Sequence, residues 1–122
     1  MPDVITPAMI EKRLRDLSKE VDEAHMYLVN TETNYNEIKG NYEIAMAKSR
    51  MKYATTSSPT GKNYTVQERE DLALIDNEKL YQDLGLIDAQ VKAARANTQR
   101  LRIQVEIARS VGTSVRTSMD LT

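Results

Sequence analysis

Two long stretches of this chain repeat apolar or small residues at alternating spacings of four and three positions. In the first stretch, which covers five heptads, these positions are Ile10, Leu14, Leu17, Val21, Ala24, Leu28, Thr31, Tyr35, Ile38, Tyr42 and Ala45. In the second they are Ala73, Asn77, Leu80, Leu84, Ile87, Val91, Ala94, Thr98, Leu101, Val105 and Ala108. A stripe of this period, sustained over several heptads, indicates a coiled coil rather than a lone amphipathic helix. The pattern predicts an all-α protein.

The first helix has a recognisable start, and a polar stretch marks its end. Thr6 can serve as the N-cap, with Pro7 at the first helical position, where its missing N–H costs nothing. Residues 54–63 are small and polar, and they include both Pro59 and Gly61. No other interior segment contains such a cluster of helix-breaking residues. We therefore expect a helix over about residues 7–53, followed by a loop over about residues 54–64.

The second helix also has start and stop signals. Thr65 and Glu68 match a capping box, in which the hydroxyl accepts from one backbone amide and the carboxylate accepts from the other. Gly112 is a plausible C-terminal cap. These signals predict a helix over about residues 65–111 and a short C-terminal tail.

The two expected helices are nearly equal in length, which is what a single folded-back domain needs. We predict an antiparallel two-helix coiled-coil hairpin, in which the numbers of facing residues sum to about 119. Leu17 then lies near Leu101 or Arg102, so that the apolar stripes face each other.

A two-helix hairpin covers only one stripe on each helix, and further apolar residues lie outside these stripes. On the first helix they are Met9, Met26, Val29, Ile44 and Met51, and on the second Leu72, Ile75, Ile103, Ile107 and Val111. Burying one such side chain is worth about 1.5–3 kcal/mol. We therefore expect a homo-oligomer, a helical bundle or a ring, with Ile103, Ile107, Val111, Leu72 and Ile75 in its interface.

Composition narrows the class of protein. The 122 residues include six Tyr but no Phe, Trp or Cys, so a thin aliphatic core between rods suits the chain better than a globular core. Without Cys there are no disulfides or thiolate metal sites. No apolar run approaches the roughly 18–20 residues that a membrane-spanning helix needs, and no signal peptide is apparent. We expect a cytoplasmic protein that has no membrane association and no cofactor.

Catalytic residues are not apparent. The chain contains one His, His25, flanked by carboxylates on an expected helix, where a surface position is the simplest interpretation. A catalytic triad needs a His held between two partners, and a zinc site needs three or four ligands. We therefore predict no catalytic residue, no metal site and no enzymatic activity.

Basic residues form two groups on the expected helices. The group next to the loop consists of Lys48, Arg50 and Lys52, and the other consists of Arg95, Arg102, Arg109 and Arg116. Because members of the second group are seven residues apart, they share one helix face. Either group could follow a phosphate backbone, and Tyr53 could stack on a base. In the expected register, however, both groups also face acidic segments, and such flanking ion pairs set the orientation of antiparallel coiled coils. The sequence leaves both interpretations open.

The segment Glu43-Ile44-Ala45-Met46-Ala47-Lys48-Ser49-Arg50-Met51-Lys52-Tyr53 resembles the corresponding helix end in the phage recombination mediator family (UvsY-like). In that family a Lys-x-Arg-x-x-Tyr stretch ends a long helix, and a polar loop and a second helix with an acidic start follow. The resemblance implies a ring-like homo-oligomer that binds single-stranded DNA and helps to load a recombinase. Lys48 and Arg50 would then contact DNA. A phage-encoded protein of this kind would act in the host cytoplasm.

Two functional hypotheses follow from these observations. The first is a non-enzymatic accessory protein that binds single-stranded nucleic acid through the two basic groups and Tyr53. The second is a structural or adaptor coiled coil, serving in phage assembly or host modulation, that binds no nucleic acid.

Overall fold

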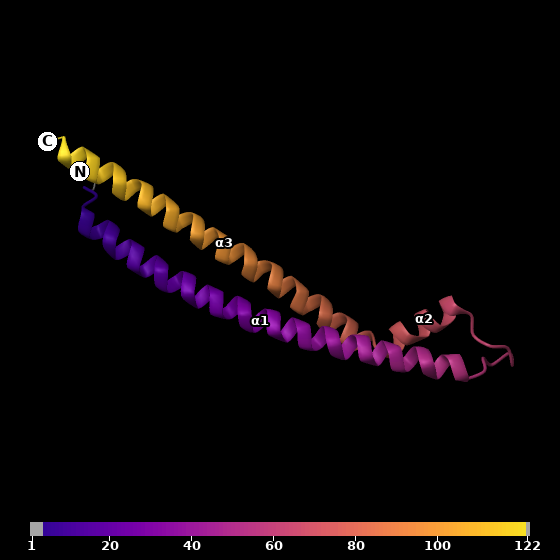
Figure 1. The fold of residues 1–122 in the computed structure, drawn as a ribbon. Coiled ribbons are helices and arrows are strands. Elements are labelled where there is room, and N and C mark those ends of the chain that lie inside the picture. Colours follow the sequence, from indigo (N-terminus) through magenta and orange to yellow (C-terminus); the bar gives the residue numbers. More distant parts are fainter. Residues whose placement is uncertain (1–3, 122) are drawn as a thin grey trace. The chain divides into compact units, whose positions relative to one another are not determined.

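The structure is a computed structural model that describes residues 4–121, and within this range the chain forms helices and no strand (Figure 1). The helices are α1 (Pro7–Thr55), α2 (Val66–Asp76) and α3 (Glu78–Asp120). The prediction of an all-α protein is confirmed. Contacts divide the chain into two units. Unit 1 comprises the described residues up to Asn30 and from Lys92 onward, and unit 2 comprises Thr31–Val91.

The start of α1 follows the capping signal in the sequence. The Thr6 hydroxyl accepts a hydrogen bond from the Met9 amide at 3.2 Å, and the Thr6 carbonyl accepts one from the Ile10 amide at 3.2 Å. The first bond satisfies one of the donors that every helix start leaves unpaired, and the second is the first i→i−4 bond of the helix. Thr6 is therefore the N-cap, as predicted.

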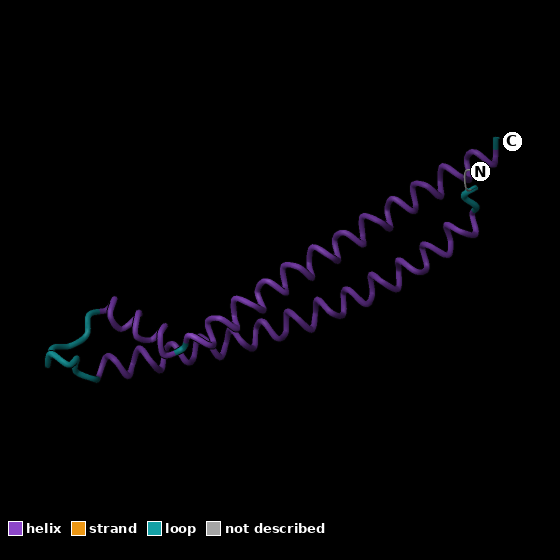
Figure 2. Tube along the Cα trace, turned by 180° about the vertical axis from the view of Figure 1, so that it is seen from behind, coloured by secondary structure: helices purple, strands orange, loops and turns teal. Residues whose placement is uncertain are grey.

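In unit 1, parts of α1 and α3 lie side by side and run in opposite directions (Figure 2). Leu17, Ala24 and Leu101 form a buried cluster against which Val21, Val105 and Ala108 pack. The predicted proximity of Leu17 and Leu101 is confirmed. At the rim, the Arg13 guanidinium donates to the Gln104 side-chain oxygen at 3.2 Å.

Helix α3 continues past the expected end at Val111, so that prediction was wrong. Gly112 is not a C-cap but a buried position of the stripe, four residues after Ala108, and Val115 continues the stripe half-buried. A Cβ at Gly112 would lie 3.1 Å from Ile10 Cγ2. Glycine at this position therefore reflects the close approach of α1 rather than the end of a helix.

In unit 2, a helix break replaces the continuous second helix that we expected over about residues 65–111. Helix α2 ends at Asp76 and α3 begins at Glu78. Asn77 between them has φ −113° and ψ 25°, and its side-chain amide donates to the Ala73 carbonyl at 2.8 Å. An Asn side chain that bonds to nearby backbone in this way competes with the regular helix ladder. The four-three spacing gave no sign of the break, because Asn77 itself keeps its place in the stripe.

The loop between α1 and α2 is a compact turn. Gly61 has a positive φ of 79°, which a residue with a Cβ adopts at a cost. Its amide donates to the Ser58 carbonyl at 2.9 Å, and the Ser58 amide donates to the Lys62 carbonyl at 2.9 Å. At the start of α2, the Thr65 hydroxyl accepts from the Glu68 amide, and the Glu68 carboxylate accepts from the Thr65 amide, both at 3.1 Å. The predicted capping box is confirmed.

Candidate nucleic-acid interface

The basic residues next to the loop are engaged with acidic residues of α2. Arg50 Nε lies 2.7 Å from Glu70 Oε1, and Lys52 Nζ lies 3.8 Å from Asp76 Oδ2. The first pair joins the two segments that the antiparallel register had placed opposite each other. At this end of α1, two of the three predicted phosphate-binding cations therefore take part in ion pairs within unit 2.

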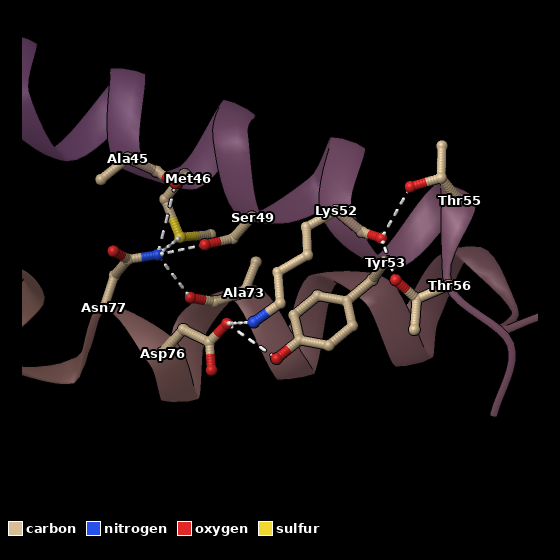
Figure 3. Close-up of polar contacts among 10 residues, drawn as sticks. All are labelled: Ala45, Met46, Ser49, Lys52, Tyr53, Thr55, Thr56, Ala73, Asp76 and Asn77. Carbon is tan, nitrogen blue, oxygen red and sulfur yellow. Dashed lines mark hydrogen bonds and ion pairs between the residues drawn. The ribbon is translucent and has the colours of Figure 1, made fainter. Parts of the chain in front are cut away.

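Tyr53 contributes to the same network. Its hydroxyl donates to Asp76 Oδ2 at 2.7 Å, and Lys52 Nζ lies 5.0 Å from the centre of its ring (Figure 3). The Tyr64 ring meets it edge-on, with the centroids 5.7 Å apart. The hydrogen bond to Asp76 raises the pKa of Tyr53 above its usual value, because the bond is made by the neutral hydroxyl. The ring that we expected to stack on a base instead packs at the tip of unit 2.

Asn77 forms a separate polar contact with α1. Its amide nitrogen lies 3.0 Å from Ser49 Oγ, and Figure 3 shows it directed toward α1 next to Met46. Met46 is buried, with 5% of its surface exposed, and Ala73 is completely buried. The polar contacts thus surround a small apolar core.

Lys48 differs from its two neighbours in the loop-proximal group. Its side chain is exposed, and it forms no ion pair or hydrogen bond within the described part of the chain. One unpaired lysine does not form a path along which a phosphate backbone could run.

The second basic group contains three unpaired cations. Arg102, Arg109 and Arg116 are all exposed on α3, and their guanidinium groups form no ion pair or hydrogen bond with any residue in the range 4–121. We call these three residues the arginine stripe. Arg95, which the sequence placed in the same series, has an interaction of its own and is not counted in the stripe.

Carboxylates lie near the arginine stripe without pairing with it. Arg102 and Arg109 line one groove of unit 1 together with Asp22 and Glu106. By sequence, unit 1 carries ten Lys and Arg against eight Asp and Glu, whereas unit 2 carries seven against ten. The arginine stripe therefore lies in the unit with the net positive charge.

Four of the five residues that we predicted for an oligomer interface are exposed. The exposed fractions are 47% for Ile103, 57% for Ile107, 37% for Val111 and 66% for Ile75. Leu72 is instead half-buried within unit 2, next to the fully buried Ala73. Its place in an oligomer interface stays a prediction.

A groove in unit 1 includes one apolar residue, Ile5, that the sequence pattern did not identify. It has a volume of about 410 Å³, and its apolar lining includes Ile5, Met9, Ile107 and Val111. Ile5 lies before the N-cap of α1, outside any helical repeat, so the search for four-three spacing passed over it. An apolar residue just before an N-cap often packs onto the first turn, and this could have identified it.

No helix within residues 4–121 has a stretch that is both long enough and apolar enough to span a bilayer. In the same range, no group of three or more His, Asp or Glu side chains is arranged to hold a metal ion. Comparison with protein-family models, with curated proteins and with solved structures finds no match for this chain.

Proposed function

We propose that this chain is a non-enzymatic accessory protein that binds single-stranded nucleic acid through unit 1. The observation that carries the proposal is the arginine stripe: three guanidinium groups on one helix face, all exposed and all without an ion pair in the described residues. An unpaired arginine contacts a phosphate without first breaking a bond inside the protein.

The spacing of the arginine stripe suits a flexible single strand of nucleic acid. Seven residues of helix span about 10.5 Å, so the stripe extends over about 21 Å along α3. A single strand can adjust its backbone to such a row, and each contact made releases counterions. Three contacts with a single strand should make log K fall against log salt concentration with a slope of about −2.

Fluorescence anisotropy with labelled oligo-dT tests this proposal. The triple substitution Arg102→Ala, Arg109→Ala and Arg116→Ala should abolish the salt dependence and weaken binding on the order of tenfold or more. The matched control is Arg50→Ala with Lys52→Ala, which removes cations already paired in unit 2. Equal losses in the two variants, or no binding by the unaltered chain at physiological salt, would refute the assignment.

The proposal also includes the finer architecture. We propose that α1 folds back on α2 and α3 as one antiparallel coiled-coil hairpin, that the hairpins self-associate into a bundle or ring, and that the protein acts in the cytoplasm. Continuous burial along both heptad stripes supports the hairpin. The resemblance at residues 43–53 supports a role in loading a recombinase onto single-stranded DNA. Within that segment Lys48 is the one cation available for the implied DNA contact.

A second candidate function rests on the paired cations. The contacts Arg50–Glu70 and Lys52–Asp76 are the kind of flanking ion pairs that orient coiled coils. They favour a structural or adaptor coiled coil, in phage assembly or host modulation, whose charges serve its own folding. That function requires a protein partner and no oligonucleotide binding at physiological salt, so the anisotropy measurement separates the two candidates.

A further inference from the structure

A groove on unit 2 lies across the break between α2 and α3. It has a volume of about 380 Å³, and its lining residues are Leu74, Ile75, Glu78, Tyr81 and Gln82. Three of the five are apolar or aromatic and exposed, with exposed fractions of 38% for Leu74, 66% for Ile75 and 54% for Tyr81. The groove therefore presents apolar surface to solvent on both sides of the helix break.

The chain segment that forms this groove is strongly acidic. By sequence, residues 66–91 carry seven Asp and Glu against two Lys and Arg. Two of the seven carboxylates, those of Glu70 and Asp76, pair with Arg50 and Lys52 of α1. Even with these two pairs subtracted, the segment has more carboxylates than cations.

Two carboxylates are available at the groove itself. Glu78 lines it, and Asp71 precedes Ile75 by four residues, which is about one helical turn. Both side chains are exposed, and neither forms an ion pair within the described part of the chain. Their contacts are with neutral amides, Gln67 with Asp71 at 2.9 Å and Gln82 with Glu78 at 3.4 Å. A positively charged ligand can therefore reach both carboxylates.

We propose that this groove binds a short basic amphipathic helix of a partner protein. The apolar side of that helix covers Leu74, Ile75 and Tyr81, and its Lys and Arg residues contact Asp71 and Glu78. The inference goes beyond the proposed function and does not depend on it, because the groove lies in unit 2 and the arginine stripe lies in unit 1.

Charge identifies the class of partner. Nucleic acid, an anionic lipid surface and the same face of a second copy all carry the sign of the groove, and like charges across an interface disfavour association. A cationic side chain is instead attracted to the carboxylates of Asp71 and Glu78. It also gains from the exposed ring of Tyr81, since Lys and Arg bind to the faces of aromatic rings.

The spacing of the groove residues favours a helix as the partner. Leu74, Glu78 and Tyr81 follow one another at spacings of four and three, so apolar and acidic side chains share one face. From Asp71 to Gln82 the axial rise is about 16 Å, which about three turns of a partner helix match. Apolar anchors three or four residues apart are typical of helices that bind in grooves. A contact this short belongs to the small, transient class of interface.

Fluorescence anisotropy with a labelled synthetic peptide tests the proposal on the full chain. The probe is a peptide of about 18 residues, long enough to form a helix, with Leu at heptad spacing and Lys elsewhere. It should bind on the order of tenfold more tightly than the same peptide with Glu in place of Lys. A peptide with the same Leu and Lys content in scrambled order should also bind more weakly. Equal binding of the ordered and scrambled peptides would overturn the proposal.

Two matched pairs of variants locate the site. Glu78→Gln should weaken peptide binding several-fold, whereas Glu37→Gln, which removes an exposed carboxylate of α1 in the same unit, should not. Ile75→Ser should weaken binding on the order of tenfold, whereas Ile44→Ser should not, although Ile44 is 57% exposed in the same unit. Circular dichroism checks that each variant keeps its helix content. Equal losses within either pair would show general attraction to an acidic protein and would overturn the proposal.

The same Ile75→Ser variant distinguishes the other occupants. If it loses oligo-dT binding, the groove is part of a nucleic-acid site, and if light scattering shows that it loses self-association, the groove holds a second copy. Either result would overturn the proposal. The triple substitution of the arginine stripe should leave peptide binding unchanged. If oligo-dT binds and the Lys peptide does not, this inference fails and the proposed function stands.

Discussion

In unit 1 the facing stripes of α1 and α3 are apolar along most of their length, whereas in unit 2 side-chain hydrogen bonds and ion pairs cross between the helices. Leu17 and Leu101 illustrate the first case, with 1% and 5% of their surfaces exposed. Asn77, bonded across to Ser49, illustrates the second. The same heptad spacing is therefore stabilised in two ways within one chain.

This difference determines which surfaces remain available. In unit 2, Arg50 and Lys52 have partners on α2, and the loop-proximal group is largely closed to a ligand. In unit 1 the helix contacts rely mainly on burial, and Arg102, Arg109 and Arg116 stay exposed and unpaired within the described residues. A cation predicted from sequence therefore becomes unavailable where an acid of the facing helix pairs with it, as Glu70 does with Arg50 and Asp76 does with Lys52.

The largest expected effect comes from removing apolar contact in unit 1. Leu17→Ala should lower the free energy of unfolding by about 2–5 kcal/mol, because it leaves a cavity in the tightest part of the seam. Urea denaturation followed by circular dichroism, at fixed chain concentration, measures this. Leu86→Ala is the control, since Leu86 is 66% exposed and should change stability by less than about 0.5 kcal/mol. Similar losses in both variants would show that unit 1 does not depend on its buried stripe.

The next largest effect should come from the polar contact in unit 2. Asn77→Ala removes the donor that Ser49 and the Ala73 carbonyl share, and it should cost about 1–2 kcal/mol despite the higher helix propensity of Ala. Asn41→Ala, at an exposed position on α1, is the matched control and should be neutral. A gain in stability for Asn77→Ala would mean that the helix break weakens unit 2 rather than fixing its register.

The sequence alone was enough to identify the helical segments on either side of the loop and their buried faces, because both depend on a long repeat. Every position of the two predicted stripes, from Ile10 to Ala45 and from Ala73 to Ala108, is buried or half-buried. The capping residues Thr6 and Thr65 could also be identified from the sequence, since caps depend on local spacing.

The helix break and the availability of the cations could not be predicted, because they depend on contacts between segments distant in sequence. Asn77 keeps its place in the stripe, and nothing in the spacing indicates that its side chain bonds to Ser49 on α1 as well as to the Ala73 carbonyl. Gly112 looked like a cap until Ile10 was found against it. For Arg50 the sequence offered both an acid and a phosphate as partners, and only the distance to Glu70 decided between them within unit 2.

A smaller loss of stability should follow from removing the capping bond at the start of α2. Thr65→Ala removes the capping hydroxyl and should cost about 1 kcal/mol, whereas Thr65→Ser keeps the hydroxyl and most of the stability. Amide hydrogen exchange in the first turn of α2 should increase in the Ala variant alone. Equal exchange in the two variants would show that the capping bond does not contribute to the stability of the tip.

The smallest effect concerns pH and distinguishes the tip of unit 2 from unit 1. The hydrogen bond that Tyr53 donates to Asp76 raises the pKa of the phenol in the folded state above its unfolded value of about 10. Between these two pKa values the folded state binds more protons than the unfolded state, so stability falls as pH rises above about 10. Below that pH the contribution is fully present. Alkaline unfolding should therefore be less steep for Tyr53→Phe than for the unaltered chain, and Tyr81→Phe is the control for an exposed tyrosine of the same unit. If all three profiles coincide, the bond to Asp76 does not stabilise unit 2, and the polar character of that unit rests on Asn77 and on the Arg50–Glu70 pair.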